Sequence, residues 1–294
     1  MSELAMIVDV ALCTNCRNCW LACKDEHVGN RFPGYAEPQP LHGHDWIDIR
    51  VRERGRYPMV DVAYLPVMCQ HCEDAPCRTA DGAVRQREDG IVVIDPDKAR
   101  GRREIVDSCP WGAIFWNEAL ELPQKWDFDA HLLDSGWSEP RCVQVCPTGA
   151  LKAQKLDAAE RARLVAAEGL ETLPPAVVAP NRGGDARGGR PRVLYRNLHR
   201  FTRHFLGGTL LSQGSDGQFD TVEGAEVSLD LGEGNPRSTT TDSFGDFRID
   251  DIAEGTAYAL TIRWQGRVVH ESRGRVEGGS LCLGDIPLGR RDPP

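Results

Sequence analysis

The sequence predicts an α+β protein of two domains, a cysteine-rich domain of loops and short strands followed by a small all-β sandwich. Ten of the eleven cysteines lie before residue 147, and only Cys282 lies beyond it. After about residue 205, apolar and polar residues alternate in short runs between glycines, which is typical of sandwich strands. We therefore expect a first domain at 1–173, a linker at 174–204 and a β-sandwich at 205–294.

The elements follow from local patterns in chain order. Short strands are predicted by apolar runs at residues 1–8, 91–96 and 149–153. Residues 156–169 predict a helix, because Asp157 is a suitable N-cap and Gly169 stands where a helix often ends. A stretch rich in proline, glycine and arginine opens at Pro174-Pro175 and predicts the linker. The alternating runs of the sandwich are residues 225–229, 244–249 and 258–264.

Composition excludes several classes of function. The 294 residues carry a net charge of −9, which argues against nucleic acid as the main partner. No apolar run approaches the roughly 18 residues that a membrane span requires. The N-terminus has no basic segment and no twin arginine, so we expect a cytoplasmic protein without a membrane span. No nucleophile triad and no phosphate-binding loop is found, and we expect no catalytic residue in this chain.

The first cysteine run has the spacing C-x2-C-x2-C-x3-C at Cys13, Cys16, Cys19 and Cys23. This is the run of bacterial ferredoxins, in which three cysteines hold one [4Fe–4S] cluster and the fourth crosses to a paired cluster. The late segment CVQVCPTGAL contains Cys142 and Cys146-Pro147, the matching half of such a pair. The crossing rule therefore predicts a first cluster, with the ligands Cys13, Cys16, Cys19 and Cys146.

A second run has the spacing C-x2-C-x4-C at Cys69, Cys72 and Cys77. Cys109-Pro110 again has the form of a crossing fourth ligand. Asp81 stands where a crossing cysteine could follow the run, and the three cysteines expected before Cys109-Pro110 are absent, so the partner cluster is missing. The second predicted cluster thus has the ligands Cys69, Cys72, Cys77 and Cys109.

Two alternatives explain less of the pattern. A zinc site of four thiolates could combine Cys13 and Cys16 with Cys69 and Cys72, but it leaves the remaining cysteines of the first run and both Cys-Pro elements unexplained. A disulfide framework is disfavoured by the clustered spacing. With complete cysteine sets, we expect the histidines near the runs to pack around the clusters rather than to bind metal. They are His27, His71 and His131.

Taken together, these motifs resemble the iron–sulfur subunits of the molybdopterin (DMSO-reductase-type) oxidoreductases. Within them, the chain is most similar to small subunits of the pyrogallol–phloroglucinol transhydroxylase and resorcinol hydroxylase type. The resemblance covers nearly the whole chain. It is carried by Asp25-Glu26-His27, Trp46, residues 52–55, Tyr57-Pro58, the segment from Cys69 to Cys77, residues 82–84 and 86–91, residues 130–134, residues 194–201 and residues 244–247.

The resemblance implies the remaining features of the prediction. The first domain would be bacterial-ferredoxin-like, and the closing sandwich transthyretin-like or immunoglobulin-like. A large catalytic subunit, in a heterodimer or higher complex, would carry molybdenum or tungsten on a bis-pterin cofactor and act on a polyphenol. This chain would transfer electrons to or from that subunit. The alternative is a mainly structural subunit of a transhydroxylase complex, in which no net electron flow is required.

One departure from the family concerns a third cluster. The family uses a C-x2-C pair just before the segment 130–134, and here Trp126 and Asp129 occupy those positions. Cys23 and Cys142 remain as the other two presumed ligands. Tryptophan cannot bind iron, whereas Asp129 could supply an oxygen. We expect a remnant site of Cys23, Cys142 and Asp129 in which the third cluster is lost, with an altered cluster as the alternative.

Overall fold

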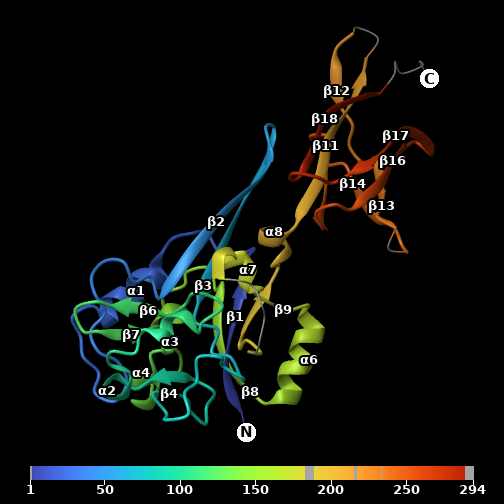
Figure 1. The fold of residues 1–294 in the computed structure, drawn as a ribbon. Helices are drawn as coiled ribbons and strands as arrows, with labels where there is room; N and C mark the ends of the chain where they lie inside the picture. Colours follow the sequence, from blue (N-terminus) through green and yellow to red (C-terminus); the bar gives the residue numbers. More distant parts are fainter. Residues whose placement is uncertain (1, 183–188, 215–216, 233, 289–294) are drawn as a thin grey trace. The chain divides into compact units, whose positions relative to one another are not determined.

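The computed structural model describes residues 2–182, 189–214, 217–232 and 234–288. Contacts divide the chain into two compact units (Figure 1). The first unit comprises residues 1–51 and 64–198, and the second comprises residues 52–63 and 199–294. The division therefore follows long-range packing, and each unit contains two separate stretches of the chain.

The first unit contains short strands and short helices around long loops. Its elements are β1 (Glu3–Asp9), α1 (Asn18–His27), β4 (Val84–Gln86), β5 (Val92–Ile94), α2 (Pro96–Ala99), α3 (Glu104–Asp107), β6 (Phe115–Asn117), β7 (Leu122–Gln124), α4 (Ala130–Asp134), α5 (Arg141–Gln144), β8 (Leu151–Leu156), α6 (Ala158–Glu168), β9 (Glu171–Thr172), α7 (Pro175–Val178), the 3₁₀ helix η1 (Pro180–Arg182) and β10 (Val193–Arg196).

A four-stranded sheet of order β8-β1-β10-β9 organises the first unit. Strand β1 is buried along nearly its whole length and pairs antiparallel with β8 and parallel with β10. The register pairs Val8 with Leu151, and the backbone N–H of Asp9 donates to the carbonyl of Ala150 at 2.8 Å. Because β8 runs antiparallel to β1, the chain that enters β8 arrives beside the loop that leaves β1.

The predicted helix at 156–169 is confirmed as α6. Asp157 accepts a hydrogen bond from the backbone N–H of Glu160, whose side chain accepts one from the N–H of Asp157. This reciprocal capping box satisfies two amide groups that the first turn leaves without helical partners. Gly169 ends the helix with φ of 60°, a left-handed conformation that glycine adopts at little cost.

The expected linker at 174–204 contains ordered elements on either side of residues 183–188, which lie outside the described part. Strand β10 is the third strand of the first unit's sheet, and Val193, Leu194 and Tyr195 are buried. The prediction of a linker is therefore wrong for this strand. Its apolar side chains are too few to produce a recognisable pattern, and pairing with β1 supplies the burial that they need.

The hairpin of β2 (Ile47–Arg56) and β3 (Met59–Met68) belongs to both units. Its ends lie in the first unit, whereas its tip at 52–63 belongs to the second, so the predicted boundary at 173 does not describe the division. Arg54 of the tip is buried and forms ion pairs with Asp61 and Asp250, the latter at 3.1 Å. A buried guanidinium needs such partners, which explains why these distant segments pack together.

The second unit contains two four-stranded sheets. One has the order β12-β11-β15, with β18 also paired to β11, and the other has the order β14-β13-β16-β17. The elements are α8 (His199–Thr202), β11 (His204–Gln213), β12 (Phe219–Thr221), β13 (Glu226–Asp230), β14 (Arg237–Thr240), β15 (Asp246–Ile252), β16 (Ala257–Trp264), β17 (Arg267–Arg275) and β18 (Leu281–Leu288).

Alternating side chains of both sheets form one hydrophobic core in the second unit. Leu210 and Phe247 of the first sheet and Val227, Leu260 and Ile262 of the second are buried in it. The predicted alternation at 225–229 and 258–264 therefore marks inward-facing positions of β13 and β16. No helix in the described residues has the length and apolar character needed to cross a lipid bilayer.

Candidate metal centres

The first cysteine set lies where β1 and β8 meet. Cys13 and Cys16 are in the loop between β1 and α1, Cys19 is on α1, and Cys146 follows α5 just before β8. Asn15 and Arg17 adopt left-handed φ values of 57° and 60°, which turn the loop sharply between its cysteines.

Electrostatics show that these thiols are neighbours. Burial, together with the charges of Cys13, Cys146 and Cys16, raises the pKa of Cys19 to about 12. The pKa of Cys13 is raised by burial and by Cys146 and Cys16. Thiolates held together repel one another unless a cation neutralises them, so this set has the chemistry of a metal site. Cys16 is exposed and Cys13 and Cys146 are partly exposed, so the set lies near the surface.

The second set is buried. Cys69 follows β3, Cys72 and Cys77 lie in the next loop, and Cys109 follows α3. Burial raises the pKa of Cys72, and Cys69, Cys109 and Cys77 raise it in that order. Burial, together with the charges of Cys69 and Cys109, likewise raises the pKa of Cys77 to about 12.

An apolar pocket is lined by all four thiols of the second set, together with Trp111 and Ile114. Trp111 is held in place because its indole N–H donates to the carbonyl of Leu173 at 2.9 Å. The backbone N–H of Ala113 donates to Cys109 Sγ at 3.4 Å. Four converging thiols, an apolar wall and an amide donor to sulfur are the surroundings that a buried iron–sulfur cluster requires. No disulfide joins any of the eleven cysteines.

The remnant third site is also brought together. Cys23 on α1 and Cys142 on α5 are buried, and Asp129 precedes α4. Burial raises the pKa of Cys23 well above its usual range, with Asp129 as the next cause. Cys142 shows the same order of causes, burial and then Asp129. The three residues therefore share one buried volume, although α1 and α5 are far apart in sequence.

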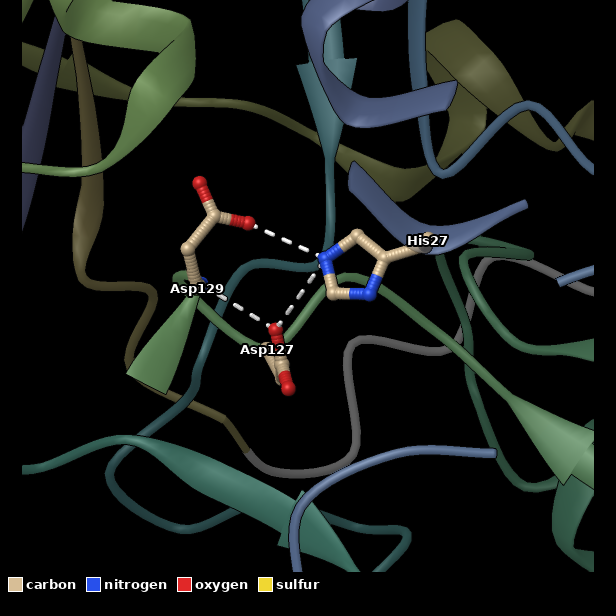
Figure 2. Close-up of side chains that lie close together, drawn as sticks. All are labelled: His27, Asp127 and Asp129. Atoms are coloured by element: carbon tan, nitrogen blue, oxygen red, sulfur yellow. Dashed lines mark hydrogen bonds and ion pairs between the residues drawn. The ribbon is translucent and has the colours of Figure 1, made fainter. Parts of the chain in front are cut away.

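Two further side chains reach this volume that the sequence analysis did not assign to the site. His27 Nε2 lies 3.1 Å from Asp129 Oδ1 and 3.9 Å from Asp127 Oδ1 (Figure 2). All three side chains are buried. Burial alone would lower the pKa of His27, but the hydrogen bond to Asp129 and the charge of Asp127 raise it. Burial raises the pKa of Asp127. From sequence, only Asp127 beside Asp129, which stands at one of the family's two cysteine positions, could have indicated this cluster.

Trp126, the other substituted position, packs among aromatic side chains. Its fully buried ring stacks on Phe128 with a centroid separation of 4.4 Å and meets the edge of His71 at 5.5 Å. His71 is anchored by the backbone N–H of Val92, which donates to Nδ1 at 3.0 Å. Trp126 is therefore part of the core beside the second cysteine set.

Comparison with known proteins matches this arrangement. A family model described as a 4Fe-4S dicluster domain matches residues 60–156. The small subunit of pyrogallol hydroxytransferase from Pelobacter acidigallici is 41% identical over 98% of this chain and 100% of that protein. The thiosulfate reductase electron transfer subunit of Salmonella typhi is 33% identical over 56% of this chain and 82% of that protein.

The B subunit of anaerobic dimethyl sulfoxide reductase from Escherichia coli (strain K12) is 33% identical over 53% of this chain and 75% of that protein. The two reductase subunits thus match about half of this chain, whereas the hydroxytransferase subunit matches both units. The chain therefore belongs to the iron–sulfur subunits of the DMSO-reductase-type oxidoreductases, in the family of the pyrogallol hydroxytransferase small subunit.

Proposed function

We propose that this chain holds two [4Fe–4S] clusters and transfers electrons for a large molybdopterin-dependent subunit. The first cluster would be held by Cys13, Cys16, Cys19 and Cys146, and the second by Cys69, Cys72, Cys77 and Cys109. The observation that carries the proposal is that thiols from distant parts of the sequence converge into these two groups. Bound clusters would supply one-electron carriers whose potentials depend on hydrogen bonds and solvent exposure.

The surroundings of the two sets suggest different roles. The second set is enclosed by Trp111 and Ile114, which exclude water, and the N–H of Ala113 supplies a hydrogen bond to sulfur. The first set reaches the surface at Cys16, and Leu12 and Leu21 are exposed on the same loop and helix. We infer that a redox partner approaches the first set, since electron transfer needs close approach and exposed apolar side chains favour docking.

The substrate of the complex is inferred from the relative with full-length similarity. That relative is a small subunit of a pyrogallol hydroxytransferase. We propose that the partner of this chain likewise acts on a polyphenol, as a hydroxylase, dehydroxylase or transhydroxylase, and carries molybdenum or tungsten on a bis-pterin cofactor. We also propose a transthyretin-like or immunoglobulin-like class for the second unit, because its two four-stranded sheets enclose one hydrophobic core.

Anaerobic purification of the native complex tests this function. We expect a large subunit with molybdenum or tungsten to copurify, and about eight irons and eight acid-labile sulfides per small subunit. Reduction of the complex by a polyphenol should bleach the cluster absorbance and produce a paramagnetic signal of reduced clusters. A stable chain without a large partner, or with abundant zinc and little iron, would refute the proposal.

A mainly structural role is the second candidate, and the third site favours it. Trp126 and Asp129 stand where the resembling family has cluster ligands, so a relay through that position would be interrupted. A transhydroxylase moves a hydroxyl group without net oxidation and needs no external electron flow. Activity of the complex with an artificial electron acceptor would support electron transfer. Turnover without any acceptor, with clusters that stay in one redox state, would support the structural role.

A further inference from the structure

The cluster of His27, Asp127 and Asp129 has the geometry of a site for a single metal ion. One ligand atom from each side chain lies within 4.8 Å of the other two. Metal–ligand bonds of about 2.1 Å at tetrahedral or octahedral angles place neighbouring ligand atoms about 3.0–3.4 Å apart. The observed separations from His27 Nε2 are 3.1 and 3.9 Å, within an ångström of that range.

Burial without sufficient partners is the second observation. The side chain of Asp127 is 5% exposed, and its Oδ2 has no hydrogen-bond partner among the described residues. Its Oδ1 faces His27 (Figure 2) and accepts the backbone N–H of Asp129, at 3.1 Å. Lys125 is buried beside the carboxylates, but its ammonium donates to the carbonyls of Val92 and Trp126. A buried carboxylate that lacks a partner is costly, and a bound cation removes that cost.

The other charged groups around the site pair with residues outside the trio, so they do not neutralise Asp127. Arg141 and His131 pair with Glu26, at 2.6 and 2.8 Å, and Arg141 also pairs with Asp25 at 2.8 Å. The backbone N–H of Arg141 donates to Asp129 Oδ2 at 2.9 Å. This hydrogen bond orients Asp129, as supporting hydrogen bonds do for metal ligands, and leaves Oδ1 directed at His27.

We propose that the buried site of His27, Asp127 and Asp129 binds a single divalent transition-metal ion, zinc(II) or iron(II), at the position of the lost third cluster. One imidazole and two carboxylates suit such ions. The thiols of Cys23 and Cys142 lie near enough to feel the charge of Asp129. The substitutions thus replace a cluster site by a mononuclear site. This proposal concerns neither of the two cysteine sets.

Metal and sulfide analysis of the full chain with its clusters is the first test. The protein is purified anaerobically and passed over a chelating resin to remove loosely held ions. We expect about eight acid-labile sulfides and one further metal, either one zinc or a ninth iron. If that metal is absent, the protein is incubated with zinc chloride and desalted, and one zinc should remain. Sulfide near twelve, or no retained metal after incubation, would overturn the proposal.

Asp127→Asn is the diagnostic variant, and Asp134→Asn is its control, because Asp134 lies outside the trio and pairs with Arg87. Asp127→Asn should lose most of the further metal at unchanged sulfide content, whereas the control should retain it. Thermal unfolding provides an independent test. With an ion bound, Asp127→Asn lowers the unfolding temperature, because bound metal stabilises the folded state.

Without an ion, Asp127→Asn removes an uncompensated buried charge and keeps an oxygen that can accept the N–H of Asp129, so the unfolding temperature should stay constant or rise. That result, together with equal metal content in both variants, would show that the trio binds no ion and overturn the proposal. If Asp127→Asn does not fold, Asp129→Asn and His27→Gln provide the same comparison with the same control.

Discussion

Replacing Trp126 and Asp129 by cysteine supplies the two thiolates that the third site lacks, and we expect the double variant to assemble a third [4Fe–4S] cluster. Cys23 and Cys142 are already buried, and the charge of Asp129 acts on both thiols. The following helix α4 begins at Ala130, directly after the second substituted position. The variant therefore changes ligands at a position where both remaining thiols are in place.

Two costs oppose this assembly. Trp126 is fully buried and stacked on Phe128, and truncation of a buried tryptophan costs about 3–5 kcal/mol. Asp129 has φ of 51°, a left-handed conformation that aspartate tolerates better than cysteine, and the exchange costs about 1–2 kcal/mol. In the absence of a cluster, the variant should therefore lose roughly 4–7 kcal/mol of unfolding free energy, a large share of the stability of an ordinary domain.

Reconstitution with iron and sulfide measures the outcome. We expect about four additional irons per chain and a recovery of the urea midpoint when they bind. A matched variant with alanine at both positions has the same packing loss and no new ligands, so it should gain no iron and recover no stability. A folded double cysteine variant that binds no further iron would refute the reasoning, as would a third cluster in the unaltered protein.

Further predictions concern the first cluster, a close backbone approach and a buried histidine. Cys146→Ser should abolish the cluster of the first run and keep the second, because Cys146 adjoins Cys13 and Cys19; paramagnetic resonance showing both clusters would contradict the ligand assignment. Gly55→Ala should lower the unfolding temperature by several degrees more than Gly266→Ala. Both glycines have left-handed φ values of 80° and 76°, but only at Gly55 would a Cβ meet the Met59 carbonyl and, at 2.6 Å, the Phe205 ring; equal shifts would contradict this contact. Burial lowers the pKa of His204 below its usual 6.5 despite an ion pair with Glu254, so the unfolded state binds more protons below that pH. The stabilisation that neutral His204 provides is complete above pH 6.5 and is lost as the pH falls toward the folded pKa. In urea unfolding at pH 7.5 and 5.5, His204→Gln should therefore reduce the decrease in unfolding free energy between the two pH values. An unchanged decrease would show that His204 is not its source.

Local sequence determined the elements whose stabilising contacts lie close together in the chain. The helix α6 was predictable because Asp157, Glu160 and Gly169 cap it through contacts within a few residues. The strands β13 and β16 were predictable because one buried face imposes alternation. The cysteine spacings are equally local, since a tight loop must present its thiolates to a single cluster.

Only the tertiary structure decided which distant segments meet. The pairing of β8 with β1 places Cys146 beside the loop that holds Cys13, more than a hundred residues earlier. The hairpin tip around Arg54 packs in the second unit because its buried guanidinium forms ion pairs with Asp61 and Asp250. No local sequence pattern indicates such partners.

For the third site, too, the sequence determined some features and only the structure showed the others. The sequence determined that two ligand positions of the family are Trp126 and Asp129, because identity and spacing need no coordinates. Only the fold showed that Trp126 packs on Phe128, while His27 meets Asp127 and Asp129 from a helix a hundred residues away. Metal geometry depends on distances of a few ångströms between side chains, and those distances are set by the packing of α1, α4 and α5 rather than by separation along the chain.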